Sequence, residues 1–498
     1  MNRALLFIFI SLCTIYVRAQ EREGVVLSNY HLTTSTFLNP AFTTDSKSYM
    51  HFNLVGIDAG FYNNLIQLKN VSAKSLIAGG ASVPNYEALA GQNKKYLYAA
   101  AVADAPAFYI SKGKMGAGFF IRARSIGDIR RMPYQITDVL LGRTDITTTE
   151  GIAINAKNAK VANMSWVEYG GNFSYMIKNR AYDIIAVGGD LKYLTGLNLQ
   201  YAVIRKLEAS YIPSVSIVAD LEGTYKSATM AWNAGSGFGG DIGISFKRML
   251  KQVDAYKAHM QKSVSKCRPI DYQFKIGASL RDIGYIKFKK ATQVMQVQGS
   301  GTIDNSRNIA DQLELNFSQS VTNGTKITGV LPLALNVHGD YNFGYHFYAG
   351  AIIQKALTPN SVTGVMASDY LSLIPRYETK NIEVALPLSL KKYSQPSLGF
   401  AVRLRSLLIG VDNIMPLIKT SNVKSFAVYF NLGYTLFKNP KCNFGTKKVD
   451  DCSRYKSGRE NFKFKSSLLR ATPIKEKPIR KKKKGARPKL KLRLFKRR

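Results

Sequence analysis

The sequence predicts an all-β protein, a transmembrane antiparallel β-barrel of about 14 strands (roughly 12 to 16), followed by a disordered basic C-terminal tail. Three observations lead to this fold class. Many short segments alternate apolar residues with polar or small ones. These segments are about as long as a tilted strand that crosses a bilayer. The composition has 28 Tyr, 25 Phe and 39 Gly but only 2 Trp, which suits many short strands joined by tight turns.

The alternation itself is clear in MGAGFFIRAR, where Phe119 and Ile121 fall on one face and Arg122 and Arg124 on the other. The same period of two recurs in YGGNFSYMI, GDIGISFK, FKIGASLR and LGFAVRLR. Successive strand side chains point to opposite faces, so each segment has one apolar and one polar face. A soluble sandwich would turn the apolar face inward and a membrane barrel would turn it outward. The barrel is favoured because the strand-rich region is too long for one sandwich and because closure removes unpaired edges.

The chain divides into four parts. Residues 1–19 have a basic start, an apolar stretch and small residues before Gln20, which predicts a cleaved signal peptide. Residues 20–46 form an N-terminal periplasmic or hatch segment, residues 47–437 the outer-membrane barrel, and residues 438–498 a basic periplasmic tail. Both ends of an even-stranded barrel lie on one side, so we expect an outer-membrane location with both termini in the periplasm.

The tail is a charge domain of its own, with 20 Lys and Arg against two Glu between Arg454 and Arg498. Its candidate residues for binding an anionic surface are Lys481, Lys482, Lys483, Lys484, Arg497 and Arg498. In the periplasm nucleic acid is not the expected partner. The expected partners are outer-membrane lipid and lipopolysaccharide, and further candidate partners of the tail are peptidoglycan or an acidic envelope protein. The alternative is a solvated extension without a partner.

Cysteine is sparse, so disulfides do not build this fold. Cys442 and Cys452 are a candidate disulfide in an oxidising periplasm, which would leave Cys267 free. Three unpaired thiols are the alternative.

Motifs for chemistry are missing from the sequence. No G-x-S-x-G, H-E-x-x-H or P-loop pattern occurs, and GSGFGG (235–240) opens an alternating strand instead of a helix. We therefore expect no enzymatic activity, no catalytic or metal-binding residues and no cofactor.

The polar strand faces carry basic residues that would point into the barrel if the apolar faces meet lipid. The candidate lumen-facing residues are Arg122, Arg124, Lys192, Lys247, Lys275, Arg281, Arg403 and Arg405. Such a lining would favour anionic solutes. The alternative is a plugged interior whose charges are paired with one another and with water.

The segment LNPAF (38–42) resembles the N-terminal NPA motif of long-chain fatty-acid channel barrels and their relatives, among them barrels associated with type IX secretion. WVEYGGNFSYMI, GFGGDIGISFK and GASLRDIGYIKF resemble more specifically a Bacteroidetes outer-membrane barrel family known only as a domain of unknown function. The resemblance implies a barrel and no reaction. By analogy, Asn39, Pro40 and Ala41 could form a hatch in the lumen. The alternative is that Pro40 ends a periplasmic arm before the first strand.

These observations predict a non-enzymatic outer-membrane barrel that acts as a channel for small or hydrophobic molecules or as an envelope component. The alternative is a scaffold or accessory subunit of a type IX secretion or gliding-type envelope complex, anchored through its basic periplasmic tail.

Overall fold

The structure is a computed structural model. It describes residues 22–72, 86–89, 91, 93–140, 153–212, 216–254, 271–304, 318–436, 442–444 and 447–449. The predicted signal peptide, the basic tail from residue 450 onward, Cys452 and the six tail residues assigned to an anionic surface lie outside the described residues. Those assignments, and the Cys442–Cys452 disulfide, stay predictions.

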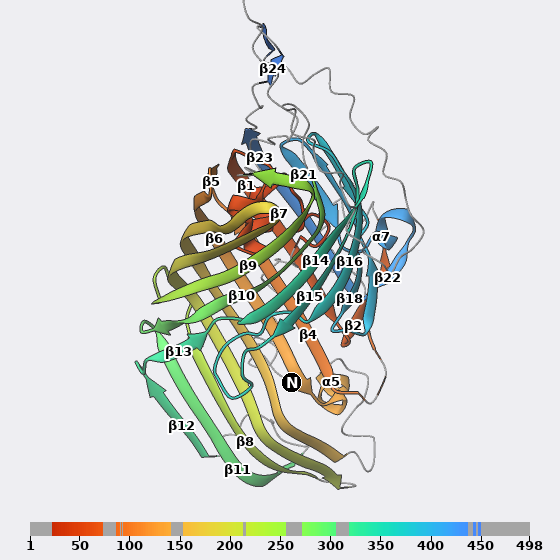
Figure 1. The fold of residues 1–498 in the computed structure, drawn as a ribbon. Helices are drawn as coiled ribbons and strands as arrows, with labels where there is room; N and C mark the ends of the chain where they lie inside the picture. Colours follow the sequence, from red (N-terminus) through yellow and green to blue (C-terminus); the bar gives the residue numbers. More distant parts are fainter. Residues whose placement is uncertain are drawn as a thin grey trace, which may run out of the picture. The chain divides into compact units, whose positions relative to one another are not determined.

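The fold is a closed antiparallel β-barrel of 14 strands, as the sequence predicts (Figure 1). Closure is made by the last and first strands, where Met50 lies opposite Leu436 and Tyr62 lies opposite Ser425. The barrel sheet consists of β1 (Met50–Asn63), β4 (Lys95–Asp104), β5 (Ala107–Lys112), β6 (Met115–Met132), β7 (Ala153–Ile212), β8 (Ser216–Ala228), β9 (Gly235–Asp254), β10 (Tyr272–Phe288), β11 (Thr292–Asp304), β12 (Ser318–Asn323), β13 (Ile327–Val330), β14 (Ala334–Gly344), β15 (Phe347–Ala356), β16 (Tyr370–Glu378), β17 (Ile382–Ala385), β18 (Leu388–Lys391), β19 (Gln395–Leu398), β20 (Phe400–Leu404), β21 (Leu407–Val411) and β23 (Ser425–Leu436).

Several of these segments join end to end into one crossing. Both β4 and β5 pair with β1 on one side and with β6 on the other. Conversely, β7 makes two crossings: its first arm pairs with β6, and its second arm pairs with β9 and then with β8. The strands β8, β11 and β12 run well past the ends of β14, β15 and β16, so the wall is taller on that side (Figure 1).

Small elements lie outside the barrel sheet: α5 (Tyr134–Leu140), α7 (Met415–Ile418), β2 (Ile66–Val71), β3 (Tyr86–Ala88), β22 (Ser421–Val423), β24 (Cys442–Phe444) and β25 (Lys447–Val449). No helix in the described part of the chain is both long and apolar enough to cross a membrane.

The outer face of the wall is apolar, as the alternation predicts. Leu191 is 81% exposed, Phe238 is 69% exposed and Ile242 is 54% exposed, whereas Asp190 and Lys192, on either side of Leu191, are buried. Apolar side chains on this face suit lipid, because lipid-facing and lumen-facing residues alternate along each strand of a membrane barrel.

The N-terminal segment from Arg22 to Ser48 fills part of the interior, and we refer to it as the plug. It contains two short helices, α2 (Leu32–Leu38) and α3 (Phe42–Asp45), and every residue in it except Tyr30 is buried. Its apolar residues form a core with the inner face of the wall: Val25, Val26, Leu27, Leu38 and Phe42 cluster with Ile352, Tyr370, Ile374, Ala385, Ala401, Leu408 and Tyr429. The plug is therefore packed against the wall as a protein core is packed.

Candidate functional site

The interior of the barrel holds seven of the eight basic residues that the sequence assigned to it. Their exposed fractions lie between 1% and 7%, and they are Arg122, Arg124, Lys192, Lys247, Lys275, Arg281 and Arg403. The assignment of Arg405 to the lumen is wrong. That residue is exposed and has a φ of 51° in the turn between β20 and β21, where strand alternation no longer applies.

Five charged residues from four strands form a band across the interior, which we call the ionic band: Arg124, Glu168, Lys192, Asp241 and Asp282. The guanidinium of Arg124 lies 2.9 Å from Glu168 Oε1 and 2.7 Å from Asp282 Oδ1. The Lys192 ammonium lies 2.7 Å from Asp241 Oδ2 and 3.0 Å from Asp282 Oδ1. Buried charges need such partners, because an isolated one is costly to bury. Strands β6, β7, β9 and β10 are thereby tied together.

A second group of buried charges joins the wall to the plug. Arg376 lies 2.7 Å from Asp340 and 3.1 Å from Glu378. The backbone N–H of Asn29 in the plug donates to Glu378 Oε1 over 2.6 Å. The hydroxyl of Ser28 donates to Glu383 over 2.7 Å, and Glu383 also pairs with Arg403. These carboxylates therefore hold wall cations and plug donors at the same time.

Both ends of the plug are fixed to the wall by ion pairs. At its N-terminal end, Arg22 pairs with Asp104 and Glu23 pairs with Lys391. At its C-terminal end, the Asp45 carboxylate lies 2.5 Å from Lys247 Nζ, and Lys47 Nζ lies 2.8 Å from Asp271. The described interior places a carboxylate within ion-pair distance of at least five of these cations: Arg122, Arg124, Lys192, Lys247 and Arg403. This arrangement matches the plugged interior with paired charges, and not an open lining for anions.

Lys275 differs from those five cations. Its ammonium lies 4.4 Å from the ring centroid of Phe42 and 3.5 Å from Asn29 Oδ1, both in the plug. A cation above an aromatic face is attracted by the ring quadrupole. Lys275 therefore also contributes to holding the plug.

His31, which caps α2, is a titratable group of the plug. Its Nε2 lies 3.0 Å from Asn431 Oδ1, and its ring centroid lies 4.9 Å from that of His51. Burial lowers the pKa of His31 well below its usual value, and His51 and Arg22 lower it further. The ring is therefore neutral when the plug is in place.

The turn formed by Asn39, Pro40 and Ala41 lies against the wall inside the barrel, and not in an arm outside it. The Asn39 amide donates to the carbonyl oxygen of Ile244 over 2.9 Å and lies 3.0 Å from His338 Nε2. Two glycines opposite each other in β7 and β9, Gly188 and Gly243, make room for this turn. A Cβ on Gly188 would lie 2.6 Å from the Ala41 nitrogen, and one on Gly243 would lie 2.1 Å from Asn39 Oδ1.

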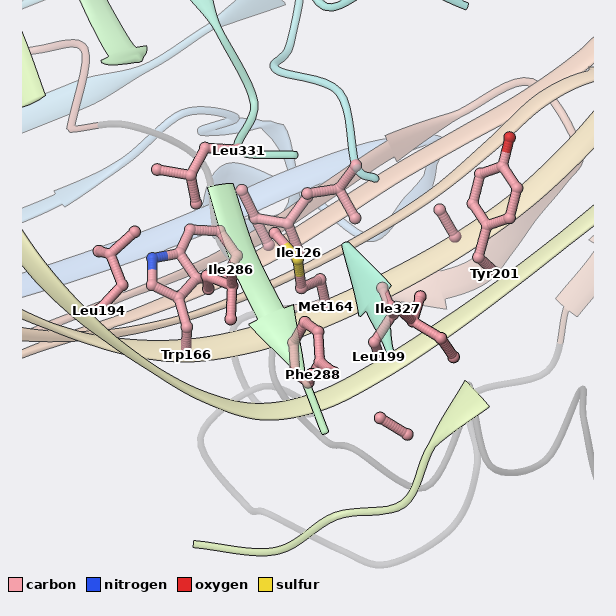
Figure 2. Close-up of a cluster of buried hydrophobic side chains, with 14 of the residues drawn as sticks. Ile126, Met164, Trp166, Leu194, Leu199, Tyr201, Ile286, Phe288, Ile327 and Leu331 are labelled. Carbon is pink, nitrogen blue, oxygen red and sulfur yellow. The ribbon is translucent and has the colours of Figure 1, made fainter. Parts of the chain in front are cut away.

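Beyond the ionic band, the lumen is lined by apolar side chains, the interior apolar cluster (Figure 2). Its buried members are Tyr62, Tyr98, Ala100, Ala101, Ile126, Ala162, Met164, Trp166, Leu194, Leu199, Tyr201, Ala228, Ala234, Ile286, Phe288, Ile327, Leu331 and Val365. Trp166 marks its border with the ionic band, because the indole N–H donates to Glu168 Oε1 over 2.8 Å.

The second arm of β7 gives the order of these zones along the barrel. Asp190 accepts from Asn172, which also donates to Pro40 of the plug. Lys192 follows in the ionic band, and then Leu194, Leu199 and Tyr201 in the apolar cluster. A strand rises about 3.3 Å per residue, so Lys192 and Tyr201 are separated by roughly 30 Å of strand. The interior therefore passes from plug to ionic band to apolar cluster.

The connection between β15 and β16 covers the apolar cluster from inside the wall. Val365 in this connection is fully buried within the cluster. Arg130 donates to the carbonyl oxygen of Gly364 over 2.8 Å, and Asp128 accepts from the Met366 N–H over 2.9 Å. The connection is thus held to β6 by polar contacts.

The interior apolar cluster was missed from the sequence. Trp166 and Met164 share the strand face of Glu168, which alternation marks as the lumen face. The available signal was local: in VANMSW (161–166), residues of both faces are largely apolar or small, and the alternation of apolar and polar residues fades. In the part of the chain that the structure describes, no group of three or more His, Cys, Asp or Glu is placed to hold a metal ion.

Three solved structures resemble this one at low sequence identity. The toluene transporter TodX of P. putida has a TM-score of 0.38 and 11% identity, covering 82% of this chain and 94% of its own. The CymD monoaromatic hydrocarbon channel has a TM-score of 0.31 and 9% identity, covering 84% and 94%. A FadL homologue of Pseudomonas aeruginosa has a TM-score of 0.26 and 10% identity, covering 84% and 98%.

No curated protein sequence matches this chain. A family model does match it, over residues 40–412, which is most of the barrel and begins within the plug turn at Pro40. By this match the chain belongs to DUF5723, a family of unknown function.

Proposed function

We propose that this chain is a non-enzymatic outer-membrane barrel that passes small hydrophobic molecules through its interior, with the plug as the gate. The observation that supports it best is the interior apolar cluster. The lumen of a membrane barrel is ordinarily polar. Here the interior contains apolar side chains, among them Trp166, Leu194, Leu199, Ile286 and Phe288. Apolar side chains inside a lumen disfavour ions and hydrated solutes and favour solutes that gain by leaving water.

The ion pairs of the interior support the same choice of solute. Arg124 and Lys192 are held by three carboxylates, so the ionic band does not present a uniform positive field to an entering anion. An anion-selective pore would need cations that are free to replace the hydration shell of its ion.

The plug supports a gated channel. It lies between the wall strands, and its turn at Asn39–Ala41 is seated on Gly188 and Gly243. With the plug in place, a solute that entered the apolar cluster would be held at the ionic band. Passage to the other side therefore requires the plug to move.

The test is transport and binding in proteoliposomes with 1-N-phenylnaphthylamine, a hydrophobic dye whose fluorescence rises in apolar surroundings. Leu199 is fully buried in the cluster, so Leu199→Asn would place an amide there, and Leu199→Met would keep an apolar side chain of similar size. We expect saturable dye binding that is lost in Leu199→Asn and kept in Leu199→Met. Each variant is first shown to be folded by a heat-modifiable band on a gel.

Three results would refute the proposal. One is dye binding no greater than that of empty liposomes. Another is equal binding by the Asn and Met variants, both folded, because the cluster would then be only a packed core. Rapid leakage of small hydrophilic anions from the unmodified barrel would also contradict it.

A further inference from the structure

A cleft of about 220 Å³ opens at the far end of the interior apolar cluster from the plug. Its walls are the two arms of β7, strand β8 and the connection between β15 and β16. Tyr201 belongs both to the apolar cluster and to this cleft. Figure 2 shows Tyr201 at the edge of the cluster, with its hydroxyl pointing away from the other labelled side chains.

The lining of the cleft is basic. Lys160, Arg205 and Lys226 line it, and none of its lining residues is acidic. Arg205 is exposed and pairs with Glu222 over 2.9 Å. The Lys226 ammonium donates to the hydroxyl of Thr363 over 2.9 Å. Lys226 thus keeps further ammonium protons for a ligand, since an ammonium has three donors, and Thr363 keeps its hydroxyl proton.

Lys160 is the informative residue. It is only 5% exposed, yet no described carboxylate lies within ion-pair distance of it. Its Nζ lies 6.0 Å from the centroid of the Tyr201 ring. In the ionic band every buried cation has a carboxylate. A buried ammonium without a carboxylate is costly, and a bound anion would offset this cost.

We propose that this cleft binds a phosphate group. With Arg205 paired to Glu222, Lys160 and Lys226 leave about two positive charges, which suit a phosphate monoester that carries close to two negative charges at neutral pH. The lining also offers neutral donors, among them Asn158, Asn360 and Ser361, for the three terminal oxygens. The phosphate comes either from a free solute or from the headgroup of a membrane lipid. The site is independent of the proposed transport, because the solute proposed there is uncharged.

The test is calorimetric titration of the detergent-solubilised full chain with inorganic phosphate, with short-chain phosphatidic acid, and with acetate as a carboxylate of lower charge. Lys160→Gln/Lys226→Gln removes two cations of the cleft. Lys289→Gln/Lys290→Gln is the matched control, because it removes two exposed charges elsewhere. Lys226→Gln alone is a second variant in case the change at buried Lys160 disturbs folding.

We expect saturable phosphate binding that is weakened roughly 10- to 100-fold in the cleft double variant, since each charge-assisted hydrogen bond contributes appreciably, and unchanged in the control. Binding of inorganic phosphate assigns the site to a free solute, and binding of phosphatidic acid alone assigns it to a lipid headgroup. Both support a phosphate site. Binding of neither, equal affinity for acetate, or equal weakening in the control variant would overturn it.

Discussion

The plug turn at Asn39–Ala41 packs against Gly188, so a larger side chain at this position should displace the turn. In Gly188→Ala, the new Cβ would lie 2.6 Å from the Ala41 nitrogen and 2.6 Å from the Pro40 carbonyl carbon and oxygen. These are backbone atoms, so no side-chain rotation relieves the overlap. The turn has to move away by roughly 1 Å to restore ordinary contact, and such overpacking typically costs about 1–3 kcal/mol.

This displacement acts on the bonds of Asn39. Its amide lies 2.9 Å from the Ile244 oxygen and 3.0 Å from His338 Nε2, and both contacts lengthen when the turn leaves the wall. The structure therefore predicts that Gly188→Ala raises the population of the displaced turn. A cost of about 1–3 kcal/mol corresponds to a change of roughly 5- to 150-fold in that equilibrium.

Thiol labelling measures this population directly. Thr33 in the plug is fully buried and its hydroxyl has no recorded partner, so Thr33→Cys in a chain without its native cysteines is a mild reporter. We expect maleimide labelling and dye uptake to be faster in Gly188→Ala than in the parent. The matched control is Gly171→Ala, because a Cβ at Gly171 meets no atom within 4 Å.

The reasoning would be refuted if Gly188→Ala and Gly171→Ala, both folded, labelled at the same rate. Faster labelling without faster dye uptake would show that the plug moves but is not the gate. That result would contradict the proposed function while leaving the packing argument intact.

Three further predictions concern the stability of the interior, read as the temperature at which the heat-modifiable gel band shifts. Arg376→Met leaves the carboxylates of Asp340 and Glu378 without this cation and should destabilise the fold by about 3–5 kcal/mol. An unchanged transition temperature would show that those carboxylates are neutral. Phe288→Ala opens a cavity in the apolar cluster and should destabilise the fold by about 3–5 kcal/mol. Phe288→Leu is the milder control. Equal destabilisation by the two variants would mean that neighbouring side chains fill the cavity and would contradict this prediction. The pKa of His31 is lowered in the folded chain. The contribution of neutral His31 to the free energy of unfolding is therefore complete above the pKa of the unfolded chain, near 6.5, and is lost as the pH falls below that pKa. Stability should therefore decline below about pH 6.5, by at most about 1.4 kcal/mol per pH unit for this group, and the decline should be smaller in His31→Gln.

The wall of the barrel could be predicted from the sequence because strand alternation is local. Each residue's neighbours two positions away reveal which face it shares, so Leu191 and Ile242 could be assigned to the outside from the sequence alone. The same rule failed at Arg405. It extended the alternation of β20, which ends at Leu404, by one residue into a turn where φ is 51° and side chains no longer alternate.

The interior could not be predicted in the same way, because its contacts join residues far apart in the chain. Arg124 and its partner Asp282 are 158 residues apart, and Ser28 and Glu383 are 355 residues apart. Alternation assigns Trp166 and Glu168 to one face but does not say that one borders an apolar zone and the other an ionic band. The cleft around Lys160 depends in addition on the β15–β16 connection, which no periodic pattern identifies.

The distribution of ion pairs decides which movement of the plug is least costly. Four residues of the described plug, all near its two ends, make ion pairs with residues outside it: Arg22, Glu23, Asp45 and Lys47. Breaking one such buried pair and leaving a charge without a partner costs about 3–5 kcal/mol, so departure of the whole plug is strongly disfavoured. The turn at Asn39–Ala41 lies between these ends and is held by neutral hydrogen bonds, each with a net contribution of about 0.5–1.5 kcal/mol. Movement of this turn alone leaves the ion pairs at both ends in place, so we expect the gate to open at Gly188 and Gly243 while both ends of the plug stay bound.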